Sequence, residues 1–150
     1  MNSQQQFKRR FSFEFFPPKT EAGMEKLQAV RDELARRKPD FFSVTYGAGG
    51  STQERTIDTV LKLHDQGIST APHLSCVGST LDNMASLLDH YIEHGVNRIV
   101  ALRGDLPSGM GSAGELRYAN ELVEFIRKHS GDHFNIEVAA YPEFHPQAES

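Results

Sequence analysis

Several polar side chains stand at or just beyond the ends of apolar segments, where they could act together. These residues are Glu14, Thr45, His73, Arg103, Asp105 and Tyr141. Glu14 is the least expected, because it lies inside the phenylalanine-rich run "FSFEFFPPK". A carboxylate buried without a partner costs several kcal/mol or has its pKa raised. Glu14 therefore either reaches water or has a chemical role, and together with Asp105 it could form an acid–base pair.

The elements that must position these side chains follow a regular rhythm along the chain. Apolar runs typical of strands alternate with helical patterns, and the first of these patterns places Met24, Leu27, Val30 and Leu34 on one face. Such alternation predicts a parallel sheet made of strand–helix units. The predicted strands are 11–16, 41–46, 70–76, 98–104 and 134–141.

Alternation within the predicted strands indicates which parallel fold is present. Neighbouring side chains of a strand face opposite ways, so each strand has one apolar face and one face that becomes small and polar toward its end. In the fourth strand we expect Val100 and Leu102 to face the helices, opposite Ala101 and Arg103. A doubly wound sheet needs two apolar faces, whereas a (β/α)8 barrel needs this asymmetry. The fold class is therefore α/β, a (β/α)8 TIM barrel.

The length of the chain accommodates only part of such a barrel. The 150 residues hold about the first five strand–helix units, whereas a complete barrel takes about 250 residues. We expect residues 1–10 to be a tail and residues 11–150 to be the N-terminal part of one catalytic barrel domain that continues in a longer protein. The Gly-rich run at 46–52 could cradle a phosphate, but a flexible turn is the favoured interpretation.

Composition excludes several classes of partner. The net charge of −4 and the lack of a basic stripe argue against nucleic acid. No apolar stretch is long enough for a membrane span, and the N-terminus does not resemble a signal peptide. With the single cysteine, Cys76, this predicts a cytoplasmic protein. The histidines show no metal-binding spacing, so we expect no metal site.

Five motifs together resemble those of the methylenetetrahydrofolate reductase family. They occur in the same order as in the family and are separated by about the same numbers of residues. They cover nearly the whole chain and are each specific. They are "SFEFFPPK" (12–19), "FFSVTYGAGGS" (41–51), "APHLSC" (71–76), "IVALRGDLP" (99–107) and "VAAYPEFHPQA" (138–148).

The resemblance implies a flavoprotein with a (β/α)8 barrel. Members use FAD to carry a hydride from NADH or NADPH to 5,10-methylenetetrahydrofolate, and nicotinamide and folate react in turn by a ping-pong scheme. The product, 5-methyltetrahydrofolate, supplies the methyl group for methionine synthesis. The family also tends to be oligomeric, so we expect a homo-oligomer.

The resemblance also assigns roles to individual positions. Glu14 matches the acid that protonates folate N10, and an apolar, water-poor site would suit this step. Asp105 matches the aspartate between flavin and folate, where its charge favours the cationic form of the substrate. Thr45 matches a nicotinamide contact. The remaining cofactor-binding matches are Tyr46, Ala48, His73, Arg103, Gly104, Tyr118, Ala119, Tyr141, His145 and Ala148.

Other interpretations of the same residues stay open. A flavin-free barrel lyase or hydrolase could use Glu14 and Asp105 as an acid–base pair, and a chain that truly ends at residue 150 could be a catalytically inactive half-barrel. Glu137 is a second inward acid, for which we expect a structural ion pair. The aromatic pairs Phe15–Phe16 and Phe41–Phe42 are interpreted as core.

Overall fold

The computed structural model describes residues 9–46, 50–105 and 114–140, without the side chains of residues 50–52. In this part of the chain, five strands alternate with four helices. The strands are β1 (Ser12–Phe15), β2 (Phe41–Val44), β3 (Thr70–Ser75), β4 (Arg98–Leu102) and β5 (Asn135–Val138). The helices are α1 (Glu21–Ala35), α2 (Gly50–His64), α3 (Leu81–Glu93) and α4 (Ala119–Ser130).

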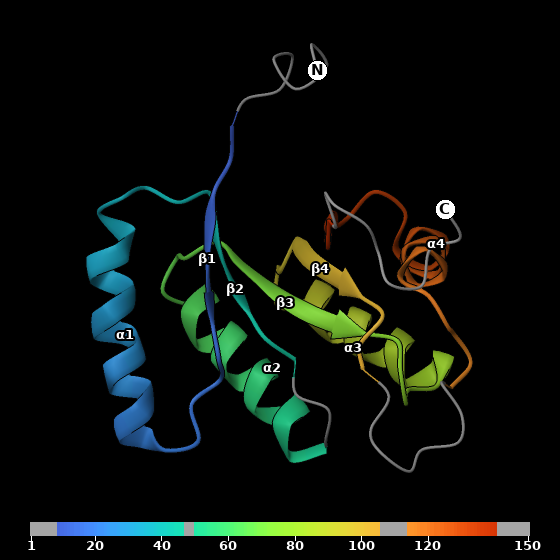
Figure 1. Ribbon diagram of the computed structural model, residues 1–150, viewed down its shortest axis with the longest axis horizontal. Coiled ribbons are helices and arrows are strands. Elements are labelled where there is room, and N and C mark those ends of the chain that lie inside the picture. Colours follow the sequence, from blue (N-terminus) through green and yellow to red (C-terminus); the bar gives the residue numbers. More distant parts are fainter. Residues whose placement is uncertain (1–8, 47–49, 106–113, 141–150) are drawn as a thin grey trace.

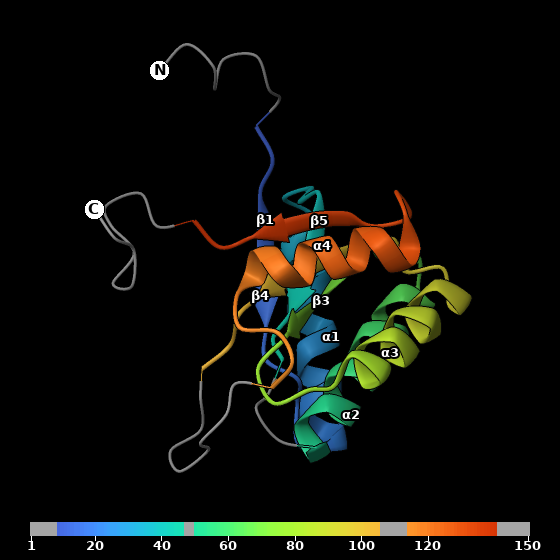
Figure 2. The same cartoon turned by 90° about the vertical axis from the view of Figure 1, so that its right-hand side faces the viewer.

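The five strands form one sheet in the order β1-β2-β3-β4-β5, and every neighbouring pair is parallel. Figure 1 shows β1 to β4 side by side, and Figure 2 shows the helices gathered on one side of the sheet. Sequential order with helices on one side results when each strand–helix–strand connection has the same right-handed sense. This is the arrangement of consecutive units of a (β/α)8 barrel, which confirms the predicted fold class.

The face of the sheet under the helices carries the hydrophobic core. Val44, Leu74, Ile99 and Ala101 are buried there and pack with the apolar faces of the helices. Phe15 stacks on Phe42 with ring centroids 5.4 Å apart, which extends the core toward β1. The opposite face, which has no helix among the described residues, carries the polar side chains.

The prediction for the fourth strand is wrong. Val100 pairs in register with His73 on the polar face, whereas Ala101 pairs with Leu74 on the helix-covered face. Ile99 and Ala101 are fully buried, and Val100 and Leu102 are only partly so. The run Ile99–Leu102 is apolar at every position, so alternation could not show which side faces the helices.

Two further expectations about burial are also corrected. Val30 is exposed on α1, and its neighbour Arg31 is buried instead, with its guanidinium against Asp32 and Gln66. A long arginine stem can cover apolar surface while its charged end finds polar partners. Phe16 is 79% exposed and therefore does not belong to the core.

Helix ends are set by local hydrogen bonds. The Thr20 hydroxyl accepts from the Gly23 amide at the start of α1, and the Thr80 hydroxyl accepts from the Asn83 amide at the start of α3. Such caps satisfy amides that have no partner within the helix. In a barrel, these helix starts follow the carboxyl ends of the strands, which is the edge where the polar side chains gather.

Candidate active site

Glu14 and His73 form a pair on the polar face of the sheet. His73 Nε2 lies 3.3 Å from Glu14 Oε2, although β2 separates the two strands. The histidine side chain is 9% exposed and the glutamate side chain is 52% exposed. Burial lowers the pKa of His73, and the Glu14 carboxylate partly opposes this shift. The structure therefore brings together the predicted acid and one predicted flavin contact.

The surroundings of Glu14 differ from the water-poor site that was expected. Half of its side chain is open to solvent, so the described residues do not form an apolar enclosure around it. Its strand neighbours Phe13 and Phe15 face the other side of the sheet, where they stack on Phe42. The phenylalanines that flank Glu14 in sequence therefore stabilise the core and do not surround the carboxylate.

Arg103, Gly104 and Asp105 form a turn directly beyond the end of β4. The Arg103 carbonyl accepts hydrogen bonds from the Ser75 hydroxyl at 3.0 Å and from the Val77 amide at 3.1 Å. Gly104 has a φ of +83°, a conformation that favours glycine. Asp105 follows this turn and is exposed. The end of β3 thus helps to set the direction in which the chain leaves β4.

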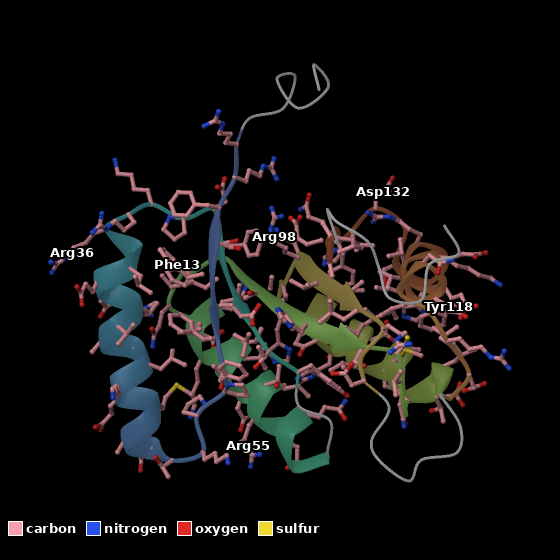
Figure 3. All side chains as sticks on the ribbon, viewed as in Figure 1. Phe13, Arg36, Arg55, Arg98, Tyr118 and Asp132 are labelled. Atoms are coloured by element: carbon pink, nitrogen blue, oxygen red, sulfur yellow. The ribbon has the colours of Figure 1, made fainter. Side chains whose placement is uncertain are left out.

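A cleft of about 430 Å³ lies beside this turn. It is lined by Ala101, Leu102, Arg103, Gly104, Asp105, Tyr118, Ala119, Asn120, Val138 and Ala139. Five predicted site residues, from two segments that are separate in the sequence, therefore line one cavity. Figure 3 shows Tyr118 at the α4 side of the molecule, far from Phe13 on β1. The cleft is lined by Ala101 of the helix-covered face and by the start of α4, so it is separate from the Glu14–His73 pair on the opposite face.

Tyr118 is positioned by the first turn of α4. The Glu121 carboxylate accepts from the Arg117 amide at 2.6 Å and from the Tyr118 amide at 3.2 Å. Negative charge at a helix start is also favoured by the helix dipole. This contact fixes the backbone of Tyr118 while leaving its ring more than half exposed at the cleft. An exposed aromatic ring of this kind can stack on a planar ligand.

Thr45 and Tyr46, which follow β2, do not line this cleft. The Thr45 amide donates to the Phe15 carbonyl, and the Thr45 carbonyl accepts from the Thr56 hydroxyl at 2.8 Å. Burial raises the pKa of Tyr46. Burial is also the main cause of the raised pKa of Tyr91 in the core, and the Tyr46 phenol adds to it. The predicted positions Ala48, Tyr141, His145 and Ala148 lie outside the described residues.

Glu137 forms the ion pair expected of it, and its partner is Arg98. The Arg98 guanidinium also lies over the Phe41 ring, 4.7 Å from its centroid. These three side chains connect β2, β4 and β5 on the polar face. Arg98 and Phe41 are the first residues of β4 and β2, whereas Glu137 is in register with Val100 in the middle of β4. An arginine held over an aromatic ring and against a carboxylate stabilises the sheet.

Sequence reasoning assigned no role to Ser75 or Glu121, although both hold predicted site residues in place. Ser75 lies two residues after His73 on the same strand, so the alternation of side chains placed both on the same face, and this could have indicated a role for Ser75. Glu121 lies three residues after Tyr118, at the spacing of a helix-capping acid. In residues 9–46, 50–105 and 114–140, no group of three or more His, Cys, Asp or Glu side chains is arranged to hold a metal ion. No helix in these ranges has the length and apolar character that a membrane crossing requires.

The fold defines the chain as part of a barrel-type α/β protein, with a candidate site at the carboxyl ends of its strands. The model of the methylenetetrahydrofolate reductase family matches residues 1–150. The chain belongs to the methylenetetrahydrofolate reductase family.

Named relatives agree with this assignment. A 5,10-methylenetetrahydrofolate reductase of Escherichia coli (strain K12) is 44% identical over 140 residues, which is 93% of this chain and 46% of that protein. Methylenetetrahydrofolate reductase (NADH) 1 of Arabidopsis thaliana is 40% identical over 141 residues, which is 91% of this chain and 24% of that protein. The chain thus spans about half of its bacterial relative and about a quarter of its plant relative.

Proposed function

We propose that the protein containing this chain reduces 5,10-methylenetetrahydrofolate to 5-methyltetrahydrofolate, with FAD and with NADH or NADPH as hydride donor. The observation that carries the proposal is the cleft beyond β4, which unites five residues that match the family's site: Arg103, Gly104, Asp105, Tyr118 and Ala119. The names of the bacterial and plant relatives support the same reaction.

The residues of the cleft fit a flavin. The volume of about 430 Å³ lies in the range of small-molecule sites. Tyr118 offers an exposed aromatic ring, and Arg103 offers a cation beside the small residues Gly104 and Ala119. A planar ring system with carbonyl groups, such as that of a flavin, suits this combination. When bound, FAD would supply the hydride transfer, and the protein would supply orientation and electrostatics.

Glu14 is the proposed proton donor. Its carboxyl group would protonate N10 of the folate, so that the five-membered ring opens and the reacting carbon becomes cationic. His73 lies within ion-pairing distance of this carboxylate and is itself largely shielded from water. We propose that His73 orients the Glu14 carboxyl group toward the substrate. The binding of folate would cover the exposed half of Glu14 and remove water from the acid.

Asp105 is proposed to stabilise the cationic substrate. It is exposed at the cleft and follows a turn whose backbone is held by β3. A carboxylate fixed beside a developing positive charge lowers the energy of that state without having to reorganise. We further propose that nicotinamide and folate bind in turn, with Thr45 near the nicotinamide.

The wider setting follows from the same family assignment. We propose a cytoplasmic homo-oligomer that works in one-carbon metabolism and methionine biosynthesis, with residues 11–150 forming the N-terminal part of one barrel domain. The plant relative's name specifies NADH. Rapid mixing with each nicotinamide in turn distinguishes NADH from NADPH.

The test uses protein expressed from the intact gene. We expect a yellow protein whose FAD is reduced by NADH or NADPH and is then reoxidised by 5,10-methylenetetrahydrofolate. A colourless protein that takes up no added FAD would contradict the proposal. Turnover of a substrate without any redox cofactor would instead support a flavin-free lyase or hydrolase.

A further inference from the structure

The carbonyl of Arg103 is held by consecutive residues at the end of β3. It accepts from the Ser75 hydroxyl at 3.0 Å, from the Val77 amide at 3.1 Å and from the Cys76 thiol at 3.3 Å. The first and last of these donors are side chains, and sulfur is a weak donor. Ser75 therefore supplies the stronger side-chain contact to the peptide group between Arg103 and Gly104.

Ser75 also fills the space beside Gly104. A Cβ atom placed on Gly104 would lie 1.9 Å from Ser75 Oγ and 3.1 Å from Ser75 Cβ. The first separation is far below any real contact, so the Ser75 hydroxyl occupies the position that a side chain at residue 104 would need. The serine and the glycine are thus complementary in shape, in addition to the hydrogen bond between Ser75 and Arg103.

Ser75 acts from outside the cleft. It is buried at the end of β3, in register with Leu102, and it does not line the cleft that contains Arg103, Gly104 and Asp105. Any influence of Ser75 on a ligand in the cleft must therefore pass through the turn. The turn contains Gly104, and a glycine backbone has access to many conformations, so contacts from neighbouring residues are needed to hold one of them.

We propose that Ser75 is a positioning residue, which holds the Arg103–Asp105 turn in the conformation that faces the cofactor cleft. The contact fixes the Arg103 carbonyl, the close fit fixes Gly104, and together they set the direction of the Asp105 side chain. The expected effect of Ser75 on FAD binding rests on the proposed function, whereas its expected effect on the conformation of the turn is independent of that function.

The experiment compares Ser75→Ala with Thr70→Val in protein expressed from the intact gene. Thr70 is on the same strand and is also buried, but its hydroxyl has no hydrogen-bond partner among the described residues. Thr70→Val therefore removes a buried hydroxyl without removing a contact. Ser75→Thr keeps the hydroxyl and serves as the rescue variant. The readouts are FAD affinity by titration and backbone amide exchange of residues 103–105 by mass spectrometry.

We expect Ser75→Ala to weaken FAD affinity about fivefold, the effect of losing one ordinary hydrogen bond. Amide exchange across residues 103–105 should also accelerate. Ser75→Thr should restore both values, and Thr70→Val should change neither. Unchanged exchange in Ser75→Ala, or an equal change in Thr70→Val, would overturn the proposal. A wild-type protein that binds no FAD would overturn the proposed function, and the exchange comparison would still test the role of Ser75.

Discussion

Two acid–base pairs lie on the same face of the sheet and differ in what they can do. Arg98 and Glu137 join β4 to β5, whereas Glu14 and His73 join β1 to β3 across β2. In each pair the basic group is the more buried one. The side chains of Arg98 and Glu137 are 12% and 40% exposed, and those of His73 and Glu14 are 9% and 52% exposed. Burial alone therefore does not separate a structural pair from a chemical one.

The difference lies in the base and in its level along the strands. An arginine keeps its charge at all accessible pH values, and Arg98 is further held over Phe41. A histidine can gain or lose a proton near neutrality, and burial lowers the pKa of His73. The residues at the carboxyl ends of barrel strands serve catalysis, and those at the amino ends serve stability. We infer that the Arg98 pair stabilises the sheet and that the His73 pair takes part in chemistry.

The largest expected effect follows from Glu14→Gln. The amide keeps the shape of the side chain but cannot donate the proton that opens the folate ring. Reoxidation of reduced flavin by 5,10-methylenetetrahydrofolate should slow by at least about 100-fold, and flavin reduction by the nicotinamide should stay nearly unchanged. Stopped-flow absorbance measures the two half-reactions separately. Equal losses in both would show that the acid role is misassigned.

Arg98→Met should lower stability with little effect on either half-reaction. The substitution keeps an apolar stem of similar length but leaves the Glu137 carboxylate without its partner and Phe41 without its cation. We expect a loss of about 1–2 kcal/mol in the free energy of unfolding, below the value for a fully buried pair because Glu137 is partly solvated. Urea denaturation measures this loss. A change smaller than about 0.3 kcal/mol would contradict a stabilising role.

Glu137→Gln gives the matched comparison with Glu14→Gln, because the same substitution is made on the same face of the sheet. We expect a loss of stability of about 0.5–1 kcal/mol, since the amide can still accept a hydrogen bond from Arg98. Stopped-flow mixing should give wild-type rates for both half-reactions. If Glu137→Gln blocked folate reduction as strongly as Glu14→Gln, the two pairs would not differ in function.

The smallest effect concerns pH. The folded protein holds the pKa of His73 below its ordinary value of 6.5. The unfolded chain therefore binds more protons just below pH 6.5, and stability falls as the pH decreases through that range. His73→Gln should remove this contribution, which is measured as the difference between the two unfolding curves from pH 7.5 downward. If the stability of the wild type and of His73→Gln changed in parallel with pH, His73 would make no such contribution. Arg98→Met should leave the slope unchanged.

Much of this arrangement could be predicted from the sequence. The rhythm of strands and helices indicated a parallel sheet, and the side chains of Ser12–Phe15, Phe41–Val44 and Thr70–Ser75 face the sides that alternation predicted. The family resemblance also assigned cofactor contacts to Arg103, Gly104, Asp105, Tyr118 and Ala119, which the structure gathers at one cleft. In Ser12–Phe15 polar and apolar residues alternate at every position, so one face of that strand is energetically defined.

The remaining features depend on contacts between distant segments. Ile99–Leu102 has no polar residue to mark a face, and its orientation is set by its pairing with β3. Phe16 looked like core because it is aromatic, yet it follows the last residue of β1 and is largely exposed. The fit of Ser75 against Gly104 joins two motifs that only the parallel pairing of β3 and β4 brings together. No local pattern carries that information.

The most direct test of the proposed site is a crystal structure of the protein from the intact gene with FAD bound. We predict that the flavin ring lies against Arg103–Asp105 and Tyr118, on the side of the sheet edge from which Glu14 is reached. A second cleft lies between α1 and α2, where it is lined by Lys19, Arg55 and Lys62 among others. A flavin bound in that cleft, or anywhere away from the carboxyl ends of the strands, would contradict the account.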